Sequence, residues 1–146
     1  MIPVAVLLAF VLTGLAAIHV YWGMGGVWPG TDEKSCARAI AGFKGLDRMP
    51  GPGPSFFVAA MLFATAALAL VSAGIVALPL PDVVIPVAAF AVALVFLGRG
   101  IAGFTPAWRR LTPEMPFARN DRLWYSPLCL LVGTGFILLS SQGLAT

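Results

Sequence analysis

Four long apolar runs alternate with three connections along the chain. The runs cover residues of about 3–22, 56–78, 83–104 and 127–144. Each run is long enough, as a helix, to cross a hydrocarbon core of about 30 Å. Inside lipid the backbone must satisfy its own hydrogen bonds, which a helix does and an open sheet edge does not. The pattern therefore predicts four transmembrane helices.

Residues that break or cap helices indicate where these spans begin. The proline-rich segment 50–54 cannot continue a helix, so Ser55 is expected to cap the second span. Asp82 is expected to cap the third span in the same way. Ser126 is expected to cap the fourth, because Pro127 suits the first helical position.

The composition assigns this pattern to a class of protein. The 146 residues are 60% hydrophobic and 10% charged, whereas soluble domains carry about 25% charged residues. A chain this short cannot bury so much apolar surface in a core of its own. We therefore expect an all-α membrane protein embedded in the lipid bilayer. Residues 1–146 would form one domain, an antiparallel up-down four-helix bundle with structured loops.

All the basic residues lie toward one end of the expected bundle. Loops 23–54 and 105–125 hold all of them except Arg99, which lies inside the third span near the same end. The positive-inside rule makes these loops cytoplasmic and both termini periplasmic. The basic residues form no compact stripe, so nucleic-acid binding is not indicated. The nine are Lys34, Arg38, Lys44, Arg48, Arg99, Arg109, Arg110, Arg119 and Arg122.

The tryptophans and tyrosines follow the same asymmetry. An aromatic belt places such side chains at both membrane interfaces, but here the opposite interface has none. Interfacial anchoring with loop packing is one explanation, and a packed cap or a ligand pocket is another. The six side chains are Tyr21, Trp22, Trp28, Trp108, Trp124 and Tyr125.

Both expected cytoplasmic loops contain helix signals. Thr31 is expected to cap a surface helix through about residue 41, with Cys36, Ile40 and Phe43 on its apolar face. Thr112-Pro113-Glu114 has the pattern of a second helix start. The charged segment 119–122 that follows is expected to be solvated.

Two motifs at these boundaries resemble a known family. One is His19-Val20-Tyr21-Trp22 followed by Gly25-Gly26 and Trp28-Pro29, and the other runs from Asn120 to Cys129 as NDRLWYSPLC. Together they resemble small bacterial four-helix membrane proteins known only as a domain of unknown function. The resemblance spans the chain and implies the same fold in a bacterial inner membrane. It implies no activity, cofactor or catalytic residue.

His19 and Arg99 are the ionisable side chains within the spans. His19 is either a proton carrier or ligand, or a neutral ring that hydrogen-bonds a neighbour near the interface. Arg99 lies about 7 Å inside the end of its span at helical rise. It either snorkels to lipid phosphates, or it holds an anionic group or pairs with a carboxylate such as Glu114 or Asp121.

No metal or nucleotide motif accompanies these residues, so any cofactor is unknown. A single histidine without a paired ligand does not indicate a metal site. The glycines at 23, 25 and 26 lack the lysine of a phosphate loop and indicate a tight turn. Cys36 and Cys129 do not form a CxxC pair, and a disulfide is not expected on the cytoplasmic side.

These features favour a non-catalytic accessory protein that binds lipid or a partner. Small residues at 69, 73 and 77, and at 98 and 102, offer faces for another membrane protein or a second copy. A transporter ranks last, because the spans contain no acidic residue.

The alternative is a small membrane enzyme or hydrophobic-ligand binder with its site at the cytoplasmic interface. Convergence of His19 and Arg99 on one cavity with Asn120 and Tyr125 would favour this alternative. The candidate residues are His19, Tyr21, Trp22, Trp28, Arg99, Asn120, Trp124 and Tyr125.

Overall fold

The computed structural model describes residues 1–144 and consists of helices joined by loops, with no strand in this range. The end of the expected domain, residues 145–146, lies outside the described residues. Four long helices account for most of the chain, and shorter ones fill the two basic loops. In order they are α1 (Ile2–Gly23), α2 (Glu33–Ile40), α3 (Pro52–Ser72), α4 (Val84–Ala102), α5 (Pro106–Leu111), α6 (Phe117–Asn120), the π-helix η1 (Asp121–Tyr125) and α7 (Ser126–Leu144).

Within residues 1–144, four helical segments are long and apolar enough to cross a membrane. They are Ile2–Gly23, Pro52–Ser72, Val84–Ala102 and Phe117–Gly143. Large apolar side chains point outward from them, such as Phe10, Val95 and Leu131, each at least 69% exposed. Lipid is the solvent that accepts such surfaces. The expected all-α multi-pass membrane protein is confirmed.

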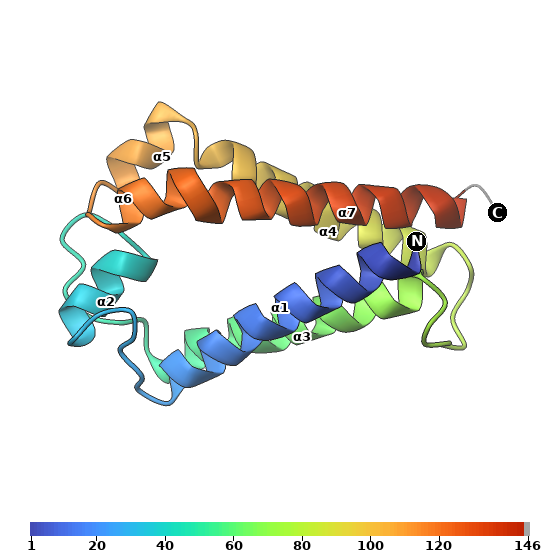
Figure 1. The fold of residues 1–146 in the computed structure, drawn as a ribbon, viewed down its shortest axis with the longest axis horizontal. Helices are drawn as coiled ribbons and strands as arrows, with labels where there is room; N and C mark the ends of the chain where they lie inside the picture. Colours follow the sequence, from blue (N-terminus) through green and yellow to red (C-terminus); the bar gives the residue numbers. More distant parts are fainter. Residues whose placement is uncertain (145–146) are drawn as a thin grey trace.

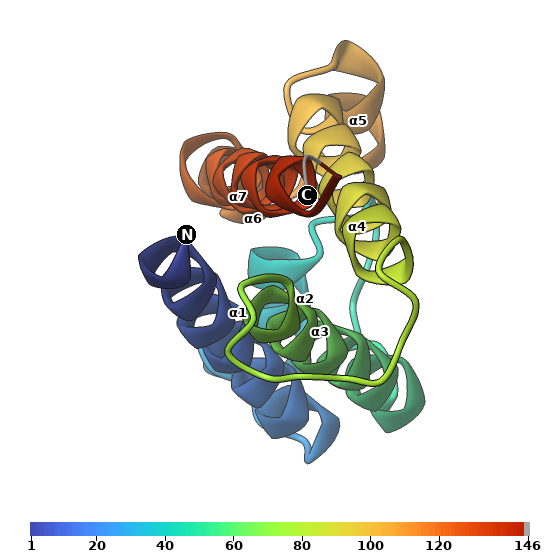
Figure 2. The same cartoon turned by 90° about the vertical axis from the view of Figure 1, so that its right-hand side faces the viewer.

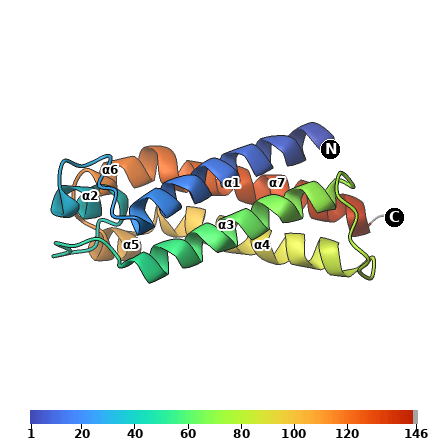
Figure 3. The ribbon, with the colours of Figure 1, turned by 90° about the horizontal axis from the view of Figure 1, so that it is seen from below.

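The four long helices run up and down as two antiparallel pairs. Helix α1 packs along α3, and α4 packs along α7 (Figure 2). The pairs meet at the end that holds Met1 and the α3–α4 loop, and they diverge toward the end that holds α2 (Figure 1). We call these the narrow end and the wide end. Helices α2, α5 and α6 all lie at the wide end (Figure 3).

The hydrophobic core fills the narrow half of the bundle. Small residues allow the helices to approach closely there, which is how helices associate in lipid. Phe136 of α7 and Leu12 of α1 are the largest fully buried apolar side chains. The cluster comprises Ala5, Leu8, Ala9, Leu12, Ala66, Ala69, Ala89, Ala93, Val132, Phe136 and Leu139. Since most of its members belong to the narrow half, the wide half is left to the loops and to the site below.

The second span differs from its expected range at both ends. Helix α3 begins at Pro52 with Gly51 as its N-cap, so Ser55 is not the cap but a buried residue of the first turn. Prolines fit there because the first helical N–H groups need no partner. The helix ends at Ser72 instead of residue 78, and Gly74, two residues after this end, adopts φ +70°. Left-handed backbone of this kind ends a helix, so the expected small-residue stripe stops before residue 77.

The expected caps of the third and fourth spans are also wrong. Val83, not Asp82, is the N-cap of α4. Ser126 is no cap, because the chain is helical from Phe117 through the π-helix η1 into α7. A π-turn shifts the hydrogen-bond pattern by one residue, and the Ser126 N–H donates to Asp121. Pro127 stands immediately after the π-turn and, without an N–H, donates no backbone hydrogen bond there.

The short helices at the wide end use different caps from those expected. Asp32, not Thr31, caps α2 through a reciprocal pair of bonds with Ser35. Phe43 lies beyond the end of α2 and contacts Trp108 edge-on, with ring centroids 6.3 Å apart. Thr112 starts no helix: it is the C-cap of α5, which Thr105 caps at its start, and the next helix, α6, begins only at Phe117.

The glycines of α4 pack differently from the expected pair at 98 and 102. A Cβ at Gly98 would meet nothing within 4 Å, so this face is open. A Cβ at Gly103, the C-cap of α4, would collide with Ser126 Oγ and lie 3.1 Å from Asp121 Oδ2. The close approach of α4 to η1 therefore depends on Gly103. Whether the open Gly98 face binds a partner stays a prediction.

Candidate ligand site at the wide end

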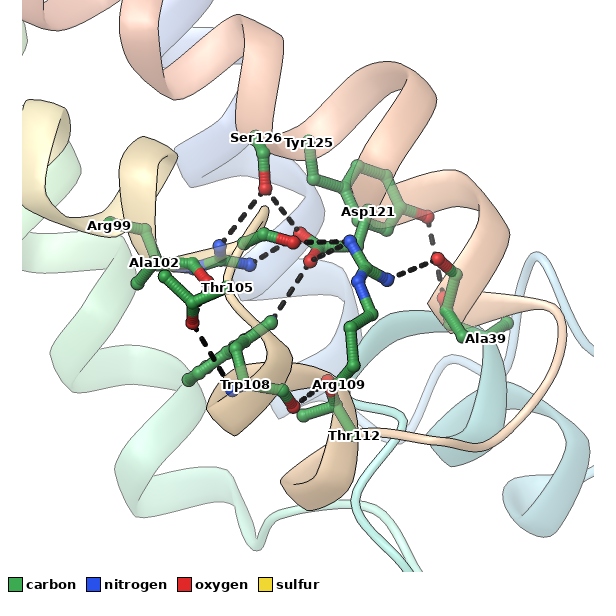
Figure 4. A network of polar contacts seen from close by, with 12 residues as sticks. Ala39, Arg99, Ala102, Thr105, Trp108, Arg109, Thr112, Asp121, Tyr125 and Ser126 are labelled. Carbon is green, nitrogen blue, oxygen red and sulfur yellow. Dashed lines mark hydrogen bonds and ion pairs between the residues drawn. The ribbon is translucent and has the colours of Figure 1, made fainter.

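A fully buried carboxylate lies where α4 meets η1. Asp121 Oδ1 accepts a hydrogen bond from Arg99 Nη2 at 2.7 Å and another from Ser126 Oγ at 3.1 Å. Asp121 Oδ2 accepts from Trp108 Nε1 at 2.9 Å and from Arg109 Nη2 at 3.4 Å (Figure 4). We call these five residues the Asp121 cluster. The expectation that segment 119–122 is solvated is therefore wrong at Asp121.

Two arginines compensate the buried charge. Burying a carboxylate is costly unless cations and hydrogen bonds replace its water. Arg99 and Arg109 both reach Asp121, and Arg109 also donates to the backbone carbonyls of Ala118 and Gly103. The cluster thus joins α4, α5 and η1 into one unit.

Arg99 is held inside the protein by this cluster. Its Nη1 donates to Ser126 Oγ at 3.3 Å, and its Cζ lies 4.6 Å from the ring centroid of Trp108. Of the two carboxylates considered from the sequence, Asp121 is the partner. Glu114 instead lies 3.8 Å from Arg38 and accepts from the Gly45 N–H. Because its guanidinium is bound by protein groups, Arg99 does not simply snorkel to lipid phosphate.

A cavity of about 660 Å³ lies between the two helix pairs at the wide end. Its walls come from α1, α2, α3, α4 and the α6–η1–α7 segment. We call it the wide-end cavity. Six of the eight candidate side chains from the sequence line it: His19, Trp22, Trp28, Arg99, Asn120 and Tyr125.

Two of the eight candidates lie elsewhere. Trp124 is 69% exposed and is not part of the cavity wall. Tyr21 lies against Gly26, and its hydroxyl accepts from the Trp28 N–H at 3.4 Å. Tyr21 therefore supports the loop that carries Trp28 and does not face the cavity itself.

Most of the remaining wall is apolar. Sequence reasoning did not assign these residues to the site, because apolar side chains carry no signal of ligand binding on their own. An apolar wall with a few placed polar groups is typical of small-molecule sites, and their usual volumes are about 300–1,000 Å³. The apolar residues that line the cavity are Leu15, Ile18, Pro29, Ile40, Val58, Leu62, Phe117 and Leu128.

His19 presents one ring nitrogen to its surroundings. Its Nδ1 lies 2.7 Å from the carbonyl oxygen of Leu15, and the ring meets Trp22 edge-on at 4.9 Å between centroids. A carbonyl only accepts, so Nδ1 carries the proton and donates it. In the neutral ring Nε2 is then an acceptor. No described residue hydrogen-bonds to Nε2.

The aromatic residues also hold the cavity walls in place. Trp22 Nε1 donates to the carbonyl of Trp28 at 2.7 Å, which ties the first loop to α1. The Tyr125 hydroxyl donates to the carbonyl of Ala39 at 3.4 Å (Figure 4). The ring of Tyr125 packs on Phe117. Loop packing and a cavity wall are therefore two roles of the same side chains.

A second cavity, of about 600 Å³, lies at the narrow end. The α3–α4 loop forms much of its wall, and Asp82 is its charged side chain. None of the eight candidate residues reaches it. Six of the residues singled out from the sequence therefore belong to the wide-end cavity and none to this one.

The fold and the cavity define a small multi-pass membrane protein with a cavity between two helix pairs. The chain belongs to the family described as "Protein of unknown function (DUF3995)", whose model matches residues 12–136. No curated protein matches the chain, and no solved structure matches it.

Proposed function

We propose that this protein is a non-catalytic membrane protein that binds a hydrophobic small molecule from the lipid phase in the wide-end cavity. One observation carries the proposal. His19 of α1 and Arg99 of α4 belong to different helix pairs, yet both line the same cavity together with Asn120 and Tyr125. The sequence alone left open whether these residues share a site.

The place of the cavity in the bundle supports a ligand taken from lipid. Leu15, Val58 and Leu128 belong to three different spans and line it, so the cavity lies at membrane depth. A ligand that partitions into lipid reaches such a site by moving sideways. The apolar wall would hold its tail, and the few polar groups would orient its head.

The contacts of the two ionisable groups fix the orientation of their side chains, which suits recognition. Arg99 pairs with Asp121, and His19 Nδ1 donates to the carbonyl of Leu15. Nε2 of His19 is left to accept a hydrogen bond from a bound ligand.

We further propose that the wide end faces the cytoplasm of a bacterial inner membrane. The basic residues outside the spans all lie in the loops at that end, and such a bias favours the cytoplasmic side. Alkaline phosphatase fused after Gly45 should be inactive, and the same fusion after Asp82 should be active. The reverse pattern would contradict this orientation.

Mass spectrometry of the retained molecules tests the binding function. The wild-type protein is extracted in native lipid particles, and its small molecules and proteins are measured. A matched pair of variants on α1 separates the cavity from the outer surface. Leu15 lines the cavity and Leu7 is 63% exposed on the outside. Leu15→Trp should remove the retained molecule and Leu7→Trp should keep it.

Two results would overturn this function. One is a stoichiometric protein partner with no small molecule, which would make the chain an accessory subunit. The other is an equal amount of ligand in both tryptophan variants, which would place the ligand outside the cavity.

A further inference from the structure

We infer that the ligand of the wide-end cavity is a membrane quinone: a flat, uncharged ring that bears carbonyl or hydroxyl groups and an isoprenoid tail. This inference rests on the proposed binding function. It is drawn from the charge balance of the cavity, from the placement of its polar groups and from its aromatic wall.

The charge balance favours an uncharged head. Arg99 is the one permanently charged side chain among the described residues that line the cavity, and Asp121 already pairs with it at 2.7 Å. Arg109 does not line the cavity, and backbone carbonyls of Ala118 and Gly103 hold it. A phosphate headgroup would have to share Arg99 with a buried carboxylate, which is a repulsive arrangement in a medium of low dielectric.

The polar groups suit a head with oxygen atoms at opposite ends. An arginine has five N–H groups. Two of those of Arg99 donate to Ser126 and Asp121, which leaves three without a partner among the described residues. Asn120 lies on the same side of the cavity, and His19 Nε2 lies on the opposite helix pair. A quinone carbonyl would accept from Arg99 and Asn120, and in the reduced form the hydroxyl at the opposite end would donate to His19.

The apolar wall suits a flat ring and a branched tail. Trp22, Trp28, Phe117 and Tyr125 bring four aromatic rings to one cavity. Aromatic faces pack favourably on flat conjugated rings. Leu15, Ile18, Val58, Leu62 and Leu128 add branched aliphatic surface from three spans. A branched isoprenoid tail matches that surface.

Quenching of tryptophan fluorescence by decylubiquinone tests the inference. The full chain is placed in nanodiscs of phosphatidylcholine and titrated with decylubiquinone, which quenches tryptophans that it contacts. We expect a saturable phase above the linear quenching due to partitioning. Trp22→Phe should reduce the amplitude of this phase, because Trp22 lines the cavity. Trp124→Phe should preserve it, because Trp124 lies outside.

A matched pair of amide variants tests the head contact. Asn120→Leu should weaken the saturable phase about fivefold, the usual effect of one lost hydrogen bond. Gln142 is an exposed amide near the other end of α7, so Gln142→Leu should leave the phase unchanged. Equal affinity of these two variants would overturn the proposed head contact and with it the quinone.

A phospholipid with brominated acyl chains separates the two levels of the proposal. No saturable phase with decylubiquinone, together with saturable quenching of Trp22 by brominated phosphatidylglycerol, would overturn the quinone and leave the binding function standing. No saturable quenching by either probe, together with no molecule retained in native lipid particles, would overturn both.

Discussion

Arg99 Nη2 lies 2.7 Å from Asp121 Oδ1, and this ion pair joins α4 to the π-helix that leads into α7. The carboxylate is fully buried, and each of its oxygens accepts two hydrogen bonds. The pair also sets the guanidinium of Arg99 at the wall of the wide-end cavity. A structural contact and a candidate binding contact thus share one side chain, so variants must separate the two roles.

Neutralising the carboxylate should destabilise the fold. Asp121→Asn keeps the shape but leaves Arg99 and Arg109 without their counter-ion. Removing one partner of a buried pair costs about 3–5 kcal/mol, and we expect about 2–3 kcal/mol because both arginines are partly exposed. Thermal unfolding in detergent measures the loss. The control is Asp82→Asn, at an exposed aspartate, with an expected effect within about 0.5 kcal/mol. Equal melting of the two variants would contradict a structural role for the cluster.

The approach of α4 to η1 should depend on one glycine and not on its neighbour. A Cβ at Gly103 would collide with Ser126 Oγ, so Gly103→Ala should destabilise by about 1–3 kcal/mol. A Cβ at Gly98 meets nothing within 4 Å, so Gly98→Ala should be neutral or stabilise by up to about 1 kcal/mol through helix propensity. Chemical unfolding of both variants measures the difference. The opposite order would mean that Gly98 is the face that packs against another helix.

The long spans were predictable because the bilayer imposes a direct rule on sequence. Apolar runs of about 20 residues must be helices in lipid, and each of the four runs forms a helix, although the second ends early, at Ser72. Convergence of the aromatic residues at one end was visible for the same reason. The up-down order of the spans places the motifs of His19 and Asn120 at the same end of the bundle. That both side chains line one cavity was not predictable, because the sequence does not specify how the helix pairs diverge.

The helix ends were less predictable because they depend on tertiary context. Gly74 ends α3 through a left-handed backbone that an apolar run does not reveal. Ser126 and Pro127 have the pattern of a helix start, but a π-turn carries the helix through them. The wide π-turn accommodates the missing N–H of proline, so the usual rule for a boundary does not apply.

The burial of Asp121 is the main feature of the site that the sequence did not reveal. A run of charged residues normally lies in water, and Asp121 stands between Arg119, Asn120 and Arg122. The one signal that pointed to Asp121 was Arg99, since a cation inside a span needs a partner. That signal indicated an ion pair but not the burial of the carboxylate. Asp121 is the acidic residue nearest to the fourth span. The roles of Trp108 and Arg109 had no comparable signal, because they depend on how α5 folds back.

The thiol of Cys36 should react slowly. Burial raises the pKa of this thiol above its ordinary value of 9.0, so less thiolate is present at pH 8. The test protein is Cys129→Ala, in which Cys36 is the remaining cysteine. The reference carries Lys34→Cys, Cys36→Ala and Cys129→Ala, so its one cysteine stands at an exposed position. Cys36 should be alkylated more slowly than the cysteine of the reference. Because the folded state holds the thiol proton more tightly than the unfolded chain, the free energy of unfolding is highest below pH 9.0 with respect to this group. It decreases as the pH rises from 9.0 through the folded-state pKa. Equal alkylation rates would show that Cys36 is accessible.

The start of α2 should depend on Asp32 and not on Thr31. Asp32 Oδ1 accepts from the Ser35 N–H at 2.7 Å, and Ser35 Oγ accepts from the Asp32 N–H at 3.1 Å. The side chain of Thr31 makes no such bond in the described structure. Asp32→Ala should therefore speed hydrogen exchange at the first turn of α2, whereas Thr31→Ala should not.

The pH dependence gives the same cap a second test. Hydrogen bonds from Ser35 lower the pKa of Asp32 below its ordinary value of 3.8. A depressed folded-state pKa means that the stabilisation is present above pH 3.8 and is lost as the pH falls through the folded value. Exchange at the Ser35 amide, corrected for its intrinsic rate, should accelerate in that acidic range in the wild type. Asp32→Ala should abolish this acceleration. An unchanged profile in the variant would show that another group controls the end of the helix.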